Sequence, residues 1–142
     1  MPYAPRFYTM VFRNFYDGKY DEGFNGVTLY RIYRTSPTAF RKIYNQIIPV
    51  LDKVMAAQSQ ISPDIIRLLV RLNIVLEYQK RRGIIDDDLA DGIKNAIDEI
   101  RKSLNNTKEL DQARKLARAL RDSLDAFLAY VIYGRRGEEE LL

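Results

Sequence analysis

The chain contains no cysteine and no histidine. Without them it has no disulfide, no Cys/His zinc site, no thiol nucleophile and no imidazole general base. Its serines never stand in a Gly-x-Ser-x-Gly arrangement, and no Gly-x-x-x-x-Gly-Lys loop is present to bind a nucleotide phosphate. The most familiar catalytic centres are therefore excluded. We expect a protein that is not an enzyme and that holds neither a metal ion nor a cofactor.

Long apolar runs are also lacking. No uninterrupted run approaches the roughly 20 residues that a membrane-spanning helix needs. The first residues, MPYAPRFYTMVFR, are aromatic and charged, unlike a secretion signal. We therefore expect a soluble cytoplasmic protein that does not contact a membrane. Its 142 residues are about the length of one domain.

Positive charge dominates most of the chain. The net charge is +4, but Glu138, Glu139 and Glu140 stand together near the end, and the rest of the chain has 23 cationic against 16 acidic residues, a net charge of +7. Such a basic body favours an anionic partner. Arginine outnumbers lysine 15 to 8, and the planar guanidinium group matches phosphate oxygens well. A heat-adapted source would explain the same richness in charge.

Residues 1–34 differ in composition from the rest. They hold ten of the sixteen Phe and Tyr residues and three of the seven glycines. Residues 6–16 and 27–34 are rich in aromatic and β-branched side chains, and the glycine-containing stretch DGKYDEGFNG lies between them. This pattern predicts either a short β-hairpin or a partly ordered aromatic arm.

From residue 35 onward the apolar residues recur with a helical period. Ser36–Pro37 and Ser62–Pro63 are typical of helix starts, and Gly83 is typical of the left-handed residue after a helix end. Pro49 should kink or interrupt the first of these helices. The sequence therefore predicts an all-α protein, a four- to five-helix bundle over residues 35–136, followed by an acidic tail at 137–142.

Two of the expected helices carry rows of cations beside their apolar faces. In the helix over 63–82, one sector about 60° wide and about 22 Å long contains four residues, and the last helix repeats the arrangement with three. The members of the two rows are Arg67, Arg71, Tyr78 and Arg82, and then Arg114, Arg118 and Arg121. Such rows can bind phosphates, but any solvated amphipathic helix shows similar ones. The pattern alone leaves both interpretations open.

Two further features of these helices have alternative interpretations. Ile66, Val70 and Ile74 form a second apolar strip opposite part of the core face, which indicates central burial or a protein–protein interface. The acidic residues Asp86, Asp88 and Asp91 could in principle serve a metal-dependent nuclease. Compensation of a helix dipole is the simpler explanation for this cluster.

Three stretches of the chain resemble the small helical subunit of type III-A CRISPR-Cas effector complexes, the Csm family. They are TSPTAFRKIYNQI, LNIVLEYQKRRG and FLAYVIYGRR. LNIVLEYQKRRG resembles the family's Tyr-x-x-Gly-Arg helix end, with Arg81 where the family tends to have glycine. FLAYVIYGRR is similar to its Phe-x-Ala-x-Val-x-Tyr closing helix. Residues 1–34 lie outside the resemblance.

The resemblance implies a non-catalytic role in antiviral defence. Several copies of such a subunit stack along the repeating backbone proteins of the complex and line the channel in which guide RNA pairs with target RNA. The expected partners are therefore the two RNAs, the backbone and large subunits, and further copies of the chain. Residues from the resemblance and from the helical rows together give the expected RNA-binding set: Arg41, Lys42, Arg67, Arg71, Tyr78, Arg81, Arg82, Arg114, Arg118, Arg121 and Arg135. The alternative is a helical adaptor that dimerises through Ile66, Val70 and Ile74 and binds no nucleic acid.

Overall fold

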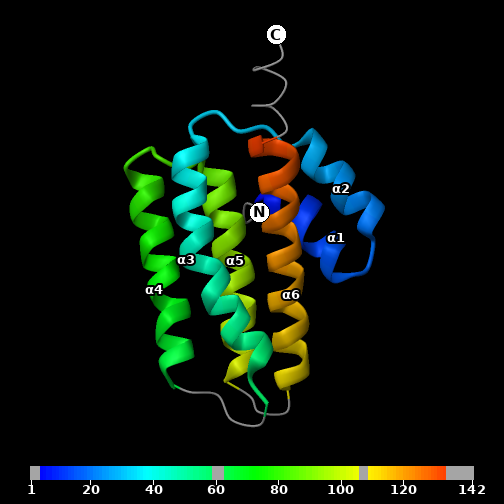
Figure 1. The fold of residues 1–142 in the computed structure, drawn as a ribbon, viewed down its shortest axis with the longest axis vertical. Coiled ribbons are helices and arrows are strands. Elements are labelled where there is room, and N and C mark those ends of the chain that lie inside the picture. The colour runs from blue at the N-terminus through cyan, green and yellow to red at the C-terminus, as the bar shows by residue number, and fades with distance from the viewer. Residues whose placement is uncertain (1–3, 59–62, 106–108, 134–142) are drawn as a thin grey trace.

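The computed structural model describes residues 4–58, 63–105 and 109–133, and in these ranges every regular element is helical. Four long helices run alternately up and down (Figure 1). They are α3 (Pro37–Ala56), α4 (Pro63–Arg81), α5 (Asp87–Leu104) and α6 (Leu110–Phe127), which η3 (Leu128–Tyr133) extends. The predicted all-α bundle is confirmed. The acidic tail at 137–142 lies outside the described residues.

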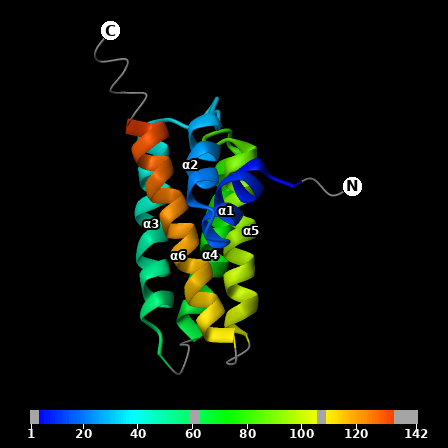
Figure 2. The same ribbon diagram turned by 90° about the vertical axis from the view of Figure 1, so that its right-hand side faces the viewer.

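The N-terminal segment is helical, so the possible β-hairpin does not form. Its elements are η1 (Phe7–Phe12), α1 (Arg13–Tyr16) and α2 (Tyr20–Leu29). The aromatic residues that suggested a strand lie in helices, and Phe7, Phe12 and Phe15 are buried in the core. Burial of these side chains outweighs their strand propensity. In Figure 2, α1 and α2 face the viewer. Both contact α6, and η1 contacts α5 as well as α6.

Two glycines serve close packing, and one of them, Gly26, belongs to the stretch that suggested a turn. A Cβ atom on Gly26 of α2 would collide with the Met10 carbonyl of η1. A Cβ atom on Gly92 of α5 would lie 2.8 Å from Cβ of Phe7. Small residues at these two positions let η1 approach both neighbouring helices. Gly18, with a φ of 79°, makes the turn between α1 and α2.

The expected helix boundaries are largely confirmed. The Ser36 hydroxyl accepts a hydrogen bond of 3.1 Å from the Ala39 amide and caps α3. Gly83 has a φ of 73°, and the amides of Gly83 and Ile84 close the end of α4. The helix α3 continues through Pro49 without a break. The expected cap Ser62 lies outside the described residues.

One end of the bundle gathers several helix termini. Because the helices alternate in direction, α3 and α5 begin where α4 and η3 end (Figure 1). The helix α4 lies at the edge of the bundle, where it contacts α3 and α5 but not α6. No helix in the described ranges has both the length and the apolar character needed to cross a membrane.

Candidate nucleic-acid interface

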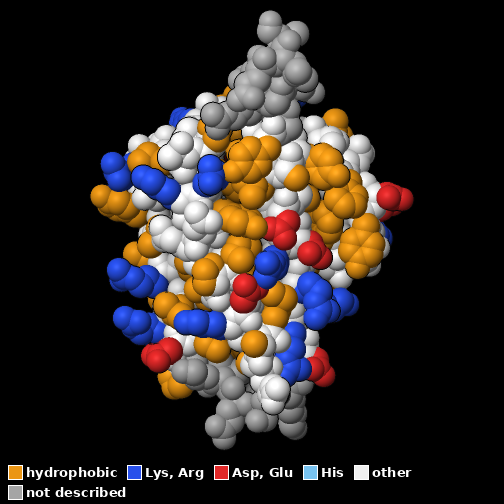
Figure 3. All heavy atoms as spheres, in the orientation of Figure 1, with side chains coloured by type: hydrophobic (Ala, Val, Ile, Leu, Met, Phe, Trp, Pro, Cys, Tyr) orange, Lys and Arg blue, Asp and Glu red, His pale blue; other side chains and the backbone are white. Residues whose placement is uncertain are grey.

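The outer side of α4 carries cations without acidic partners. Arg67 and Arg71 are exposed, and neither side chain forms an ion pair or a hydrogen bond with any residue that the structure describes. Figure 3 shows Lys and Arg side chains along the edge of the molecule over α4. One turn of helix separates the two arginines, about 6 Å along the axis. Exposed and unneutralised guanidinium groups at this spacing can bind successive phosphates of one strand.

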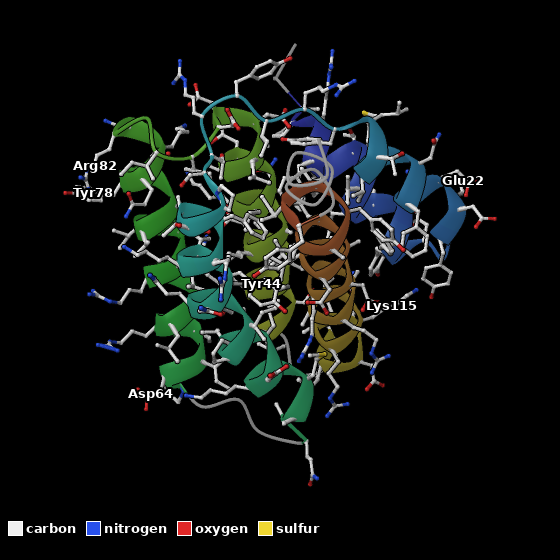
Figure 4. The ribbon with its side chains drawn as sticks, turned by 45° about the horizontal axis from the view of Figure 1, so that its top comes forward. Glu22, Tyr44, Asp64, Tyr78, Arg82 and Lys115 are labelled. Atoms are coloured by element: carbon white, nitrogen blue, oxygen red, sulfur yellow. The ribbon has the colours of Figure 1, made fainter. Side chains whose placement is uncertain are left out.

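The row ends with an arginine that is held by an aromatic ring. The Arg82 guanidinium lies 5.3 Å from the centroid of the Tyr78 ring, and the ring remains 58% exposed. Figure 4 shows both side chains on the outer face of α4, directed away from the bundle. This contact limits the motion of Arg82 without neutralising its charge. Arg67, Arg71 and Arg82 are hereafter called the α4 basic face.

Arg81 differs from its neighbour because it joins a network of ion pairs between α4 and α5. Its Nε donates to Glu77 at 2.6 Å, and Glu77 also accepts from Lys94 at 2.6 Å and contacts Lys80 at 3.2 Å. These hydrogen bonds, that of Arg81 first, lower the pKa of Glu77 to about 2. The network neutralises Arg81, although its side chain is 79% exposed. We therefore place Arg81 beside the basic face rather than in it.

The low pKa of Glu77 predicts a pH dependence of stability. The ordinary pKa is 4.5 and the folded value is about 2, so the stabilisation is fully present above about pH 4.5 and is lost as the pH falls toward 2. We expect the melting temperature of Glu77→Gln to fall less than that of the wild type as the pH is lowered over this interval. Thermal melts followed by circular dichroism between pH 2 and pH 5 test this. Parallel curves for the two proteins would contradict it.

Two cations at the start of α3 lie at the end of the bundle where α4 ends. The exposed Arg41 lies over the Tyr133 ring of η3, 5.9 Å from its centroid. Lys42 lines a pocket of about 340 Å³ between α3 and α4, and Arg82 lines it too. This α3–α4 pocket is completed by polar side chains of both helices, namely Ser36, Thr38, Gln46 and Gln79. Forty residues of sequence separate the two cations that the fold brings together here.

The row on α6 is mostly used within the molecule. Arg114 donates to the carbonyls of Ala57 and Gln58, at 2.7 and 2.8 Å, and to Asp111 at 2.7 Å. It therefore satisfies carbonyl groups at the C-terminal end of α3. Because these donors are already engaged, we leave Arg114 out of the candidate interface, and its predicted contact with RNA stays a prediction.

Arg121 is engaged in a similar way. It pairs with Asp52 of α3, and its Nε lies 3.8 Å from Asp125. Asp125 in turn accepts a hydrogen bond from the Tyr44 hydroxyl, which raises the pKa of Tyr44 to about 12. Arg121 thus belongs to a polar cluster that ties α6 to α3 and is also removed from the candidate interface. Arg118 alone of this row is exposed and forms no ion pair with a described residue.

The two rows therefore do not form one surface. The helices α4 and α6 are not in contact, and α3 and α5 lie between them. Acidic side chains are interspersed with the cations over α3 and α6 (Figure 3). The candidate interface consists of the α4 basic face, the α3–α4 pocket and Arg41. Arg135 lies outside the described residues.

The second apolar strip of α4 divides into a buried part and an exposed part. Ile66 is half-buried and packs against the core, whereas Val70 and Ile74 are 36% and 61% exposed. The last two lie in a groove of about 460 Å³ between α4 and α5. Exposed apolar side chains in a groove are a feature of protein–protein contacts.

The acidic cluster serves the fold. Asp86 accepts hydrogen bonds from the amides of Tyr33 and Arg34, at 3.0 and 2.9 Å. Asp88 accepts from the amides of Arg6 and Phe7, at 2.7 and 3.0 Å. Asp91 pairs with Lys80 at 3.0 Å. The described part of the chain contains no group of three or more acidic, His or Cys side chains arranged to hold a metal ion.

Two parts of the surface were not predicted from the sequence. The neutral residues of the α3–α4 pocket, Thr38, Gln46 and Gln79, have no distinctive spacing, because they come from two helices. Tyr20, Phe24 and Tyr130 form the second part, an exposed aromatic patch where α2 meets η3. The abundance of rings before residue 35 was the only sequence signal for this patch.

Comparisons with protein-family models, with curated proteins and with solved structures find no match to this chain.

Proposed function

We propose that this protein is a non-catalytic RNA-binding subunit of a type III-A CRISPR effector complex in the cytoplasm. It contributes its α4 basic face and α3–α4 pocket to the channel that holds guide RNA and target RNA. The observation that carries the proposal is the set of exposed cations Arg67, Arg71, Arg82 and Lys42, none of which forms an ion pair with a described residue. The sequence resemblance described above supplies the kind of complex.

The chemistry of the face suits a duplex of changing sequence. A subunit that serves many guide RNAs has to recognise backbone charge and shape rather than base edges. Guanidinium groups along a helix surface meet this requirement, since they bind phosphates whatever the base. Cleavage of RNA, where it occurs in the complex, would belong to other subunits.

The same proposal assigns contacts with proteins. Two exposed apolar surfaces are available for further copies of the chain and for the backbone and large subunits. One consists of Val70 and Ile74 in the α4–α5 groove, and the other is the aromatic patch of Tyr20, Phe24 and Tyr130. The exposed Ile74 also favours a second candidate function, a helical adaptor that dimerises through the groove and binds no nucleic acid.

Mass measurement in solution, with and without RNA, separates the two functions. We expect the pure chain to form a heavier species containing several copies when single-stranded RNA or an RNA duplex is added. A dimer whose mass does not change with RNA would favour the adaptor. Purification from the native source extends the test, because a guide RNA and repeating Cas proteins should then accompany the chain.

A further inference from the structure

The α3–α4 pocket differs in charge from three other hollows of the described surface. Lys42 and Arg82 line it, and none of its lining residues is acidic. Three other hollows of that surface each contain a carboxylate. Glu77 lies in the α4–α5 groove, Asp88 lies in the pocket near Tyr33, and Asp122 and Asp125 lie beside Tyr130. Two positive charges without a counter-charge favour an anion in the α3–α4 pocket.

We propose that this pocket is a binding site for one phosphodiester group of a bound RNA strand. The inference rests on the proposed function and extends it from a charged surface to a defined site. The Arg82 guanidinium offers a planar fork and Lys42 an ammonium group, and both are strong donors to phosphate oxygens. The Thr38 hydroxyl and the Gln46 amide add neutral donors at the wall of the pocket.

Two features favour a phosphodiester over an isolated anion. Arg82 belongs both to the pocket and to the α4 basic face, so a strand with one phosphate in the pocket can continue along Arg71 and Arg67. The contact with Tyr78 holds the Arg82 guanidinium at this junction before the ligand arrives. A group that is already ordered loses less conformational freedom on binding.

The test uses the full chain and two probes, dimethyl phosphate as the simplest phosphodiester anion and a single-stranded RNA. Backbone and side-chain amide signals in nuclear magnetic resonance spectra report on the pocket. We expect both probes to shift the Thr38 amide and the Gln46 and Gln79 side-chain amides in a saturable way. Lys42→Gln should abolish the effect of dimethyl phosphate.

A matched variant controls for net charge. Lys53→Gln removes one exposed cation from the same helix, about 16 Å from Lys42 along the axis. We expect Lys42→Gln to weaken RNA binding about tenfold and to lower the salt slope by about 0.7 unit, the value for one phosphate contact of a single strand. Lys53→Gln should change neither quantity.

The results separate failure of the pocket from failure of the proposed function. The proposed phosphodiester site fails, while the proposed function stands, in two cases. In the first, RNA binds but the amide signals of the pocket residues do not shift. In the second, Lys42→Gln and Lys53→Gln have the same effect on RNA binding. If RNA does not bind the wild type at all, both fail. If dimethyl phosphate still shifts these signals in Lys42→Gln, the proposed phosphodiester site also fails, since the anion would then bind elsewhere.

Discussion

Neutralising the α4 basic face should lower the affinity for RNA by about 100-fold at moderate salt. The triple variant Arg67→Gln, Arg71→Gln and Arg82→Gln loses three exposed guanidinium groups, none of which pairs with a described carboxylate. If each group binds one phosphate of a single strand, the slope of log affinity against log salt should fall by about 2 units. Fluorescence anisotropy with labelled RNA between about 50 and 200 mM salt measures both quantities.

The matched control removes the same charge from other places. Lys19, Lys53 and Lys102 are exposed and lie before α2, on α3 and on α5. Their triple replacement by glutamine changes the net charge equally, so it measures the long-range effect of charge alone. Sequence preference should be unaffected in both proteins, because phosphate contacts carry no base information. Equal losses in the two triple variants would show that the α4 row is ordinary solvated surface.

The helical core could be predicted from the sequence because its period is regular. The apolar residues that recur with a helical period in the last helix are all buried, namely Leu110, Ala113, Leu116, Ala117, Leu120, Leu124, Phe127 and Val131. Leu89, Ile93 and Ile97 of α5 are buried as well. A period of 3.6 residues is a local property, so it needs no knowledge of neighbours. The N-terminal helices escaped prediction because their stability comes from burial against α5 and α6 and not from their own propensities.

The site was only partly predictable for a similar reason. A helical wheel shows that Arg114 and Arg121 point away from the apolar stripe of α6, but not that Ala57 and Asp52 of α3 lie within reach. Nor does it show that Lys42 and Arg82 share a pocket. Partners distant in sequence decide which cations are neutralised and which are free. Periodicity therefore predicts candidates, and tertiary contacts select among them.

The contacts of Asp86 also come from residues distant in sequence, so they could not be predicted from periodicity. Replacement of Asp86 has the largest effect on stability that we expect. Its carboxylate is buried, and instead of capping α5 it accepts hydrogen bonds from Tyr33, Arg34 and the Thr35 hydroxyl. The Thr35 hydroxyl oxygen in turn accepts from the Asp86 amide at 2.9 Å. These contacts fix the connection between α2 and α3 onto the start of α5. Removal of the carboxylate leaves three donors without their acceptor.

We expect Asp86→Ala to lower the free energy of unfolding by about 3 kcal/mol and the melting temperature by about 10 °C. Asp86→Asn keeps one acceptor oxygen and should lose less. The control is Asp87→Ala, because Asp87 is exposed in the first turn of α5. This substitution removes only a favourable interaction with the helix dipole, so it should lower the free energy of unfolding by about 0.3–1 kcal/mol. Thermal and urea unfolding measure the differences.

A double-mutant cycle with Thr35→Val sharpens the test of this connection. Because Asp86 and Thr35 exchange two hydrogen bonds, the double variant should be less destabilised than the sum of the single variants. Additive losses would mean that the two residues act independently, and a melting temperature for Asp86→Ala equal to that of Asp87→Ala would mean that the carboxylate does not hold the connection. RNA affinity at temperatures below the transition should stay near that of the wild type, since none of the proposed phosphate contacts involves either residue.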